Sequence, residues 1–127
     1  MTIYKKIRST LFRIEPEKAH DLTLKGLRLG AGILPNPRPD DYLLASNVLG
    51  IQFSNPFGLA AGFDKNAEVT AAMYKLGFGF SEVGTLTPEP QLGNPTPRIF
   101  RLPEHEAVIN RLGFNNRGQR AAYERLL

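Results

Sequence analysis

The fold is decided by the stretch GLAAGFDKNAE, residues 58–68, in which small residues precede an acid and a lysine. Small residues such as Ala61 and Gly62 let a backbone come close to something flat or bulky. Lys65 follows at a distance from which its side chain can reach back over a bound group. The stretch matches neither G-x-G-x-x-G nor a Walker loop, so it does not indicate a dinucleotide or ATP site.

The neighbouring residues are typical of a strand, a helix and a second strand. The apolar runs 48–53 and 57–61 are short enough to be buried strands. Apolar residues at helical spacing then predict a helix of about a dozen residues. Gly77 is a natural stop for that helix, and residues 78–83 predict the next strand. A strand, a helix and a strand in this order predict a parallel βαβ unit.

This unit places two polar segments at one edge of the expected sheet. Residues 62–65 and 84–87 each follow the C-terminal end of a parallel strand. In open α/β sheets and in closed barrels, ligands bind at that edge. Taken singly, Lys65 fits a solvated surface lysine and Thr85 fits a strand-end residue. Their shared edge is what favours a ligand site, to which they would contribute a cation and a hydroxyl.

A proline-rich segment follows, with five of the ten prolines between residues 88 and 103. It predicts a long, stiffened loop with short strands near 99–100 and 107–109. The loop leads into INRLGFNN, residues 109–116, which contains three asparagines. Neutral amides suit a planar ring that carries carbonyls and N–H groups. The alternative is that asparagines beside a glycine form tight turns, which is their commonest use.

Residues 1–40 differ from the rest of the chain in charge. They hold eight basic and four acidic side chains, whereas residues 41–127 hold eight of each. Their pattern predicts two short helices that separate at Glu15-Pro16, followed by a linker at 36–41. The first helix carries one apolar stripe, and the second carries two. These stripes are Ile3, Tyr4, Ile7 and Leu11; Ala19, Leu22, Leu29 and Ile33; and Leu24, Leu27, Ala31 and Leu34.

The surplus apolar surface of this helix pair has two interpretations. The more ordinary one is that the helices pack on the following domain and that their charges are solvated. The alternative is that a basic, apolar-faced pair lies at a membrane interface.

Composition excludes several classes of protein. The 127 residues contain 42% hydrophobic and 22% charged side chains, which is ordinary for a globular chain. There is no Cys and there are two His, so a disulfide framework and a thiolate or His-rich metal site are not expected. No apolar run approaches a membrane span, and MTIYKKIRSTLF lacks the features of a secretory signal.

Three long motifs resemble one known family. They are NPFGLAAGFDKNAE at 55–68, GFGFSEVGTLTPEPQLGNPTPRIFRL at 77–102 and INRLGFNN at 109–116, with PEKAH at 16–20 adding to them. In this order and spacing they closely resemble class 2 dihydroorotate dehydrogenases. These are the membrane-associated, quinone-using flavoenzymes of pyrimidine synthesis. The basic helix pair is similar to the extension that separates this class from the soluble class 1 enzymes.

The resemblance implies an α/β fold: an FMN-binding (β/α)8 TIM barrel, preceded by a two-helix membrane-associating extension. Residues 1–40 would form the extension, and residues 41–127 the first part of the barrel. Electrons would pass from (S)-dihydroorotate to FMN and then to a quinone, in de novo UMP synthesis. The residues that match cofactor contacts are Ala61, Gly62, Phe63, Asp64, Lys65 and Thr85. The residues that match substrate contacts are Lys65, Asn110, Arg111, Leu112, Gly113 and Phe114. His20 and Arg101 match residues that line the quinone tunnel.

The implied partners are dihydroorotate or orotate, a membrane quinone and the membrane surface, with neither a metal nor a nucleic acid. Interfacial binding of the helix pair becomes the favoured interpretation once the resemblance is included. No transit peptide precedes the pair, so the expected location is the cytoplasmic face of a bacterial inner membrane, as a peripheral protein.

The chain is short for such a barrel, which needs about 250 residues. Residues 41–127 would supply two or three barrel units, and no residue here is assigned as the catalytic base, which is expected beyond Leu127. We therefore expect an N-terminal fragment of the enzyme that is inactive alone. The alternatives are an inactive truncated remnant and a stand-alone lipid-surface or interaction module.

Overall fold

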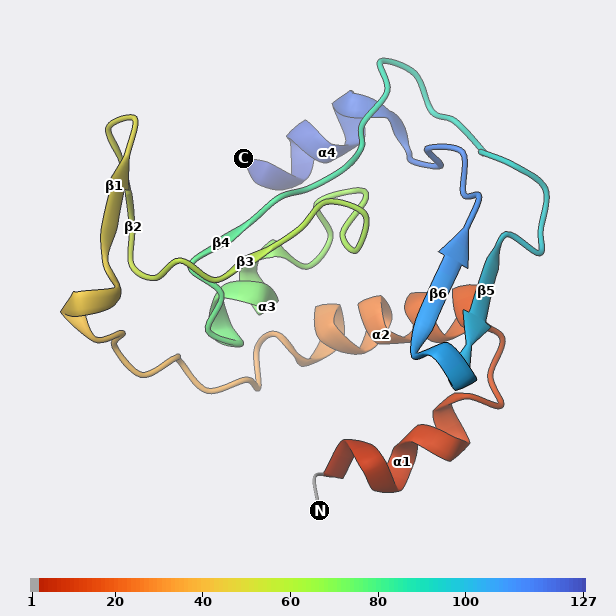
Figure 1. Cartoon of the computed structure of the whole chain (residues 1–127). Helices are drawn as coiled ribbons and strands as arrows, with labels where there is room; N and C mark the ends of the chain where they lie inside the picture. Colours follow the sequence, from red (N-terminus) through yellow and green to blue (C-terminus); the bar gives the residue numbers. More distant parts are fainter. Residues whose placement is uncertain (1–2) are drawn as a thin grey trace.

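The structure, a computed structural model, describes the backbone of residues 3–127 and the side chains from Ile7 onward. The strands of the described residues form three two-stranded sheets: β1 with β2, β3 with β4, and β5 with β6. In chain order the elements are α1 (Ile3–Leu11), α2 (Pro16–Gly30), the 3₁₀ turn η1 (Tyr42–Leu44), β1 (Ser46–Val48), β2 (Ile51–Phe53), β3 (Gly58–Leu59), α3 (Thr70–Lys75), β4 (Phe80–Ser81), β5 (Ile99–Leu102), the 3₁₀ turn η2 (Pro103–His105), β6 (Ala107–Asn110) and α4 (Gly118–Leu126). Figure 1 shows α1 and α2 along one side, the β5–β6 hairpin beside them, and the β1–β2 hairpin projecting at the opposite end.

The two predicted N-terminal helices are confirmed as α1 and α2. Pro16 occupies the first turn of α2, where its missing N–H is not needed. Glu15 caps this helix, because its carboxylate accepts from the backbone N–H groups of Glu17 at 3.0 Å and Lys18 at 2.8 Å. These two hydrogen bonds hold the pKa of Glu15 below its ordinary value. Two members of the predicted α1 stripe, Ile3 and Tyr4, have side chains outside the described ones.

The two apolar stripes of α2 differ in their burial. One stripe packs inward on a buried cluster, which we call the core cluster. Its members are Val69, Ala72 and Met73, and the stripe consists of Leu24, Leu27, Ala31 and Leu34. The other stripe faces solvent, since Leu22, Leu29 and Ile33 are 56%, 79% and 88% exposed. The packing interpretation is therefore correct for one face of α2 and does not account for the other.

The predicted parallel unit is confirmed as β3–α3–β4. Strand β3 pairs in parallel with β4, in the register Gly58 with Phe80 and Leu59 with Ser81. Gly77, with a φ of 97°, ends the helical segment as expected. Helix α3 has six residues, fewer than the predicted dozen. The reason is that residues 64–69 are held in turns around the Asp64 carboxylate.

The prediction of one strand over residues 48–53 is wrong. The chain folds back at Leu49 and Gly50, which have φ angles of 52° and 82°, and makes the β1–β2 hairpin. Two positive φ values in a two-residue loop match the right-handed twist of the strands on either side. The Asn47 side chain accepts from the Gly50 N–H at 3.1 Å and supports the turn. A leucine in such a turn is uncommon, which is why the continuous apolar run concealed it.

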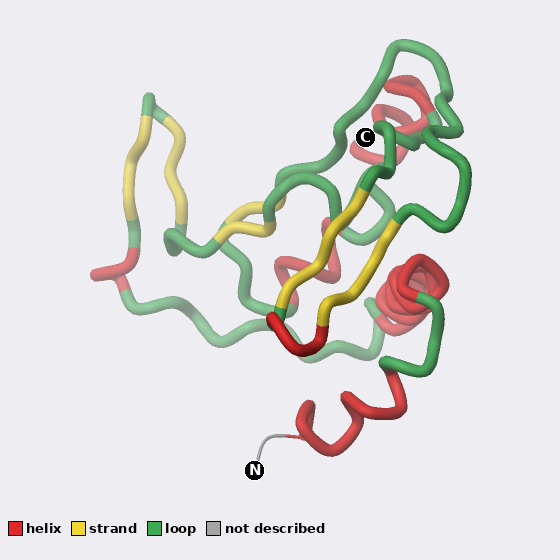
Figure 2. The backbone as a smooth tube through the Cα atoms, turned by 45° about the vertical axis from the view of Figure 1, so that its right-hand side comes forward, coloured by secondary structure: helices red, strands yellow, loops and turns green. Residues whose placement is uncertain are grey.

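The two strand candidates after the proline-rich loop are confirmed as the antiparallel β5–β6 hairpin, joined by η2. Figure 2 shows the long loop between β4 and β5 arching towards α4 before it returns to β5. The contact between loop and helix is direct, because the Gln119 N–H donates to the Thr87 carbonyl at 2.9 Å. This loop therefore lies beside the segment that follows β6.

Candidate functional site

The C-terminal ends of β3 and β4 and the segment after β6 enclose a cavity of about 300 Å³, which we call the strand-edge pocket. Its lining brings together nine of the residues singled out in the sequence. They are Ala61, Gly62, Lys65, Thr85, Asn110, Arg111, Leu112, Gly113 and Phe114. Three segments that lie apart in the chain thus form one site.

The floor of this pocket is backbone. Gly62 donates its N–H to the Gly84 carbonyl at 2.8 Å, and Gly84 donates to the Asp64 carbonyl at 3.0 Å. Both glycines have positive φ angles, 105° and 111°, which disfavour other residues. No atom lies within 4 Å of the point where a Cβ on Gly62 would stand. The backbone is therefore open to the approach of a flat ligand at Gly62.

Lys65 is the cation of the strand-edge pocket. Its ammonium group donates to the Gly62 carbonyl at 2.7 Å, which folds the side chain back over the glycine segment. Burial lowers the pKa of Lys65, and the carboxylates of Glu17 and Asp21 oppose that shift. A half-buried ammonium group in such a pocket suits an anionic ligand or negative charge that develops during a reaction.

Asp64 and Phe63 lie outside this pocket. The Asp64 side chain is completely buried, and its carboxylate accepts from the N–H groups of Glu68 and Val69, each at 2.8 Å. The Phe63 ring packs on the core cluster and meets the His20 ring edge-on at 5.3 Å. Both side chains have structural partners, so a contact with a ligand would have to come from their backbone.

Asn94 was missed in the sequence and lines the strand-edge pocket. Its N–H donates to the Leu112 carbonyl at 3.0 Å, and its side-chain amide donates to the Arg111 carbonyl at 2.7 Å. The only local signal was the turn-forming Gly-Asn-Pro at residues 93–95. Pairing with a segment 17 residues away could not be inferred from it.

The asparagines at 115 and 116 have separate roles. Asn115 lines the strand-edge pocket, and its side-chain oxygen is buried without a hydrogen-bond partner among the described residues. Asn116 is buried and accepts from the Gly118 N–H at 2.8 Å, so it organises the turn into α4. The ring-binding interpretation thus remains open for Asn115, and the turn interpretation holds for Asn116.

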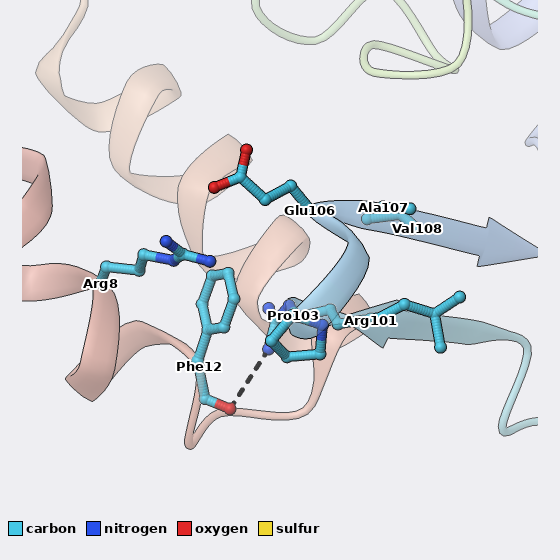
Figure 3. A pocket seen from close by; sticks show the side chains of 8 residues that line it. Arg8, Phe12, Arg101, Pro103, Glu106, Ala107 and Val108 are labelled. Carbon is cyan, nitrogen blue, oxygen red and sulfur yellow. Dashed lines mark hydrogen bonds between the residues drawn. The ribbon is translucent and has the colours of Figure 1, made fainter.

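A second cavity, of about 420 Å³, lies between α1 and the β5–β6 hairpin, and we call it the helix–hairpin cavity. Figure 3 shows Arg8 reaching into it from α1 and Phe12 from the turn that follows α1, opposite Arg101 and Pro103. The guanidinium of Arg101 lies 4.9 Å from the centre of the Phe12 ring and donates to the Ile14 carbonyl at 2.7 Å. An aromatic ring and a cation, those of Phe12 and Arg101, therefore lie in contact on the wall of this cavity.

The structure does not bring His20 and Arg101 into one cavity. His20 lines a third, polar pocket together with Glu17, Lys65 and Arg98, and it is absent from the lining of the helix–hairpin cavity. Its Nε2–H donates to the Phe63 carbonyl at 2.7 Å. His20 therefore lies closer to the glycine segment than to the cavity that Arg101 lines.

Two absences hold for the part of the chain that the structure describes. There is no cluster of three or more His, Cys, Asp or Glu side chains that could hold a metal ion. Over the same residues, no helix combines the length and the apolarity that crossing a bilayer requires.

Residues 43–127 match the family model for dihydroorotate dehydrogenase. The chain belongs to the dihydroorotate dehydrogenase family. Among curated relatives it is 56% identical, over its whole length, to dihydroorotate dehydrogenase (quinone) of Parvibaculum lavamentivorans, of which it covers 36%. It is 58% identical over 119 residues to the Brucella ovis protein of the same name, covering 94% of this chain and 32% of that one. A mitochondrial dihydroorotate dehydrogenase (quinone) of Cyclocybe aegerita is 56% identical over 94% of this chain and 36% of its own length.

Solved structures agree with this assignment. DHODH from Eimeria tenella in complex with ferulenol superposes with a TM-score of 0.80 at 53% identity, over 87% of this chain and 29% of that one. The ligand-free form from the same organism gives a TM-score of 0.79. The chain thus spans about a third of the length of the relatives that it matches.

Proposed function

We propose that this chain is the N-terminal part of a longer enzyme that oxidises (S)-dihydroorotate to orotate, with FMN as cofactor and a quinone as electron acceptor. The enzyme would serve de novo pyrimidine synthesis. The observation that carries the proposal is the strand-edge pocket, in which nine residues of the family-like motifs lie together. In the longer protein, β3–α3–β4 would open a (β/α)8 barrel, and residues 1–40 would form an extension packed against residues 41–127.

The strand-edge pocket fits a flavin. No atom lies within 4 Å of the point where a Cβ on Gly62 would stand, which leaves room there for a planar ring system. The side-chain oxygen of Asn115 is buried and has no hydrogen-bond partner among the described residues, so it could accept from a ring N–H. In the proposed enzyme Ala61, Gly62 and Thr85 hold the flavin, which supplies the electron-accepting chemistry. Lys65 stabilises the negative charge that accompanies reduction.

The substrate would lie beside Lys65 and the segment after β6. Lys65 would pair with the carboxylate of dihydroorotate, and the amide of Asn110 would hydrogen-bond the ring. The backbone of residues 111–114 would shape the rest of the substrate surface. The catalytic base is not assigned to any residue of this chain, so it would come from the remainder of the protein.

The quinone would enter at the helix–hairpin cavity. Arg101 offers a cation that can hydrogen-bond a quinone oxygen. The Phe12 ring, on which the guanidinium groups of Arg8 and Arg101 stack at 5.0 and 4.9 Å, adds apolar surface to the cavity wall. His20 would contact the quinone only at the inner end of its route, since its ring lies against Phe63. The relatives are named dihydroorotate dehydrogenase (quinone), which supports this acceptor.

The membrane surface would be met by the exposed stripe of α2, formed by Leu22, Leu29 and Ile33. The exposed side chains Lys25 and Arg28 lie on the same helix and would attract anionic lipid. The proposed location is peripheral, at the cytoplasmic face of a bacterial inner membrane. A stand-alone lipid-surface module is the second candidate, because the same stripe could serve it without any flavin.

The test is flavin reduction in the longer protein. Stopped-flow mixing with dihydroorotate should bleach the flavin, and Lys65→Ala should slow that step by about a hundredfold or more, as loss of an electrostatic catalytic group does. A near-normal bleaching rate in this variant would reject the role of Lys65. A longer protein that binds vesicles and holds no FMN would favour the lipid-surface module instead.

A further inference from the structure

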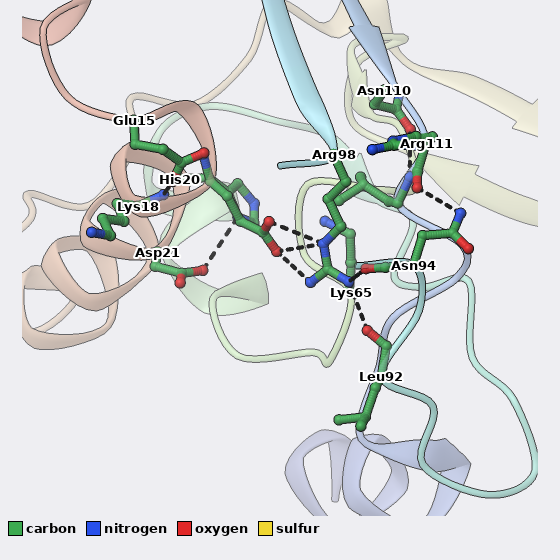
Figure 4. Close-up of polar contacts among 12 residues, drawn as sticks. Glu15, Lys18, His20, Asp21, Lys65, Leu92, Asn94, Arg98, Asn110 and Arg111 are labelled. Carbon is green, nitrogen blue, oxygen red and sulfur yellow. Dashed lines mark hydrogen bonds and ion pairs between the residues drawn. The ribbon is translucent and has the colours of Figure 1, made fainter. Parts of the chain in front are cut away.

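The side chain of Arg98 joins α2 to the loop between β4 and β5. Its Nε–H donates to both carboxylate oxygens of Glu17 at 3.0 Å, and its Nη2 bonds the same carboxylate. Its Nη1 donates to the carbonyls of Leu92 at 2.7 Å and Asn94 at 2.9 Å. Figure 4 shows Arg98 with Leu92 and Asn94 beside it, at the point where the loop approaches α2.

The Glu17–Arg98 pair differs from a surface ion pair. The two side chains are only 17% and 11% exposed, respectively. The hydrogen bonds that Arg98 donates to the Glu17 carboxylate raise the pKa of Arg98, so the guanidinium is charged at every relevant pH. A shielded, forked pair of this kind is strong and fixes geometry, whereas exposed pairs contribute little.

The loop that Arg98 holds is a wall of the strand-edge pocket. Asn94 bonds the carbonyls of Leu112 and Arg111, and the Arg111 N–H donates to the Arg98 carbonyl at 2.8 Å. The approach is so close that a Cβ on Gly93 would collide with the Leu112 carbonyl. A movement of Arg98 would therefore shift Asn94, Arg111 and Leu112 together, and all three line the pocket.

We propose that Glu17 and Arg98 are positioning residues that couple α2 to the substrate wall of the strand-edge pocket. Neither side chain lines that pocket, so each acts through its neighbours: through the backbone of residues 92–94 and 110–112, and through the charge that Glu17 places near Lys65. The inference rests on the proposed function, and it adds a role for α2 in substrate affinity besides its membrane face. Substrate affinity would thus depend on how α2 is docked.

The experiment uses the longer protein loaded with FMN and measures orotate binding from the change in flavin absorbance. Glu17→Gln keeps the shape of the side chain but loses its charge, and Arg98→Lys keeps the charge but loses the fork. We expect the Kd of orotate to rise about fivefold in the first and about tenfold in the second, within the range for residues that act on a site through a network. The KM for dihydroorotate should rise in parallel, while kcat stays within about twofold.

Two further variants separate positioning from general destabilisation. Arg120→Ala is the control, because it removes an exposed ion pair with Glu124 on α4. The two side chains are 90% and 61% exposed, so the Kd of orotate should stay unchanged. The double variant Glu17→Gln/Arg98→Lys should bind orotate no more weakly than Arg98→Lys alone, because the two residues act as one unit.

Orotate affinity within twofold of the parent protein in both single variants would overturn the proposal. Strictly additive losses in the double variant would overturn the claim that the two residues act as a unit. If Arg98→Lys does not fold, the Kd of orotate in Glu17→Gln alone tests the proposal, since Glu17→Gln is the milder change. Failure of the proposed function looks different, because the parent protein itself would then neither hold FMN nor oxidise dihydroorotate.

Discussion

Replacing Asp64 should destabilise the protein without removing the proposed flavin. The Asp64 carboxylate accepts from two N–H groups, those of Glu68 and Val69, at 2.8 Å, in a site with 0% exposure. Leaving a buried donor without a partner costs about 1–3 kcal/mol, so Asp64→Ala should lose roughly 3 kcal/mol. Asp64→Asn keeps one acceptor oxygen and should lose about 2 kcal/mol.

The assay is thermal unfolding of the longer protein, with and without FMN. At about 2 °C per kcal/mol for a large domain, Asp64→Ala should lower Tm by roughly 6 °C. The control is Asp41→Asn, which alters an exposed carboxylate that caps only the Leu43 N–H, at 3.0 Å, and should cost about 1 kcal/mol or less. An unchanged Tm in Asp64→Ala would refute the capping role. Loss of FMN from Asp64→Asn at unchanged Tm would instead mean that this side chain contacts the flavin.

Two other predictions concern the cations of the two cavities. In the proposed enzyme, Arg101→Ala should raise the KM for quinone about tenfold or more, because the cation proposed to bond the quinone oxygen is lost. Flavin reduction by dihydroorotate should keep its rate, and equal damage to both steps in stopped-flow and steady-state assays would contradict this. Lys65→Met should increase the free energy of unfolding of the flavin-free protein, because burial lowers the pKa of Lys65 below its ordinary value of 10.5 and so penalises the charged form in the folded state. Between the pKa of Lys65 in the folded protein and its pKa in the unfolded chain, the unfolded chain holds more protons. The gain in the free energy of unfolding should therefore be full below the folded pKa and should shrink as the pH rises towards 10.5. Denaturant titrations that show no gain at neutral pH would contradict this prediction.

Much of the local structure could be predicted from residue patterns alone. Pro16, the apolar runs 57–61 and 78–83, and Gly77 correctly predicted α2, the parallel unit and the end of α3. These features depend on interactions between residues close in the chain, such as backbone preferences and the spacing of apolar side chains. The same reasoning failed at Leu49, where an apolar residue occupies a turn.

The motifs also indicated the candidate site, because segments at the ends of parallel strands must meet at one edge of the sheet. Residues 61–65 and 84–85 could be placed there from sequence. That the segment after β6 forms the opposite wall followed only from the family resemblance, since spacing alone leaves the position of a hairpin open.

Only the tertiary structure decided which side chains face one another. It turned Asp64 inward as a cap, separated His20 from Arg101, and buried one stripe of α2 while leaving the other exposed. It also paired Glu17 with Arg98 across 81 positions of the chain. Each residue alone is compatible with a solvated surface position. Burial and hydrogen bonding between distant segments depend on how those segments pack, and no local pattern in the sequence carries that information.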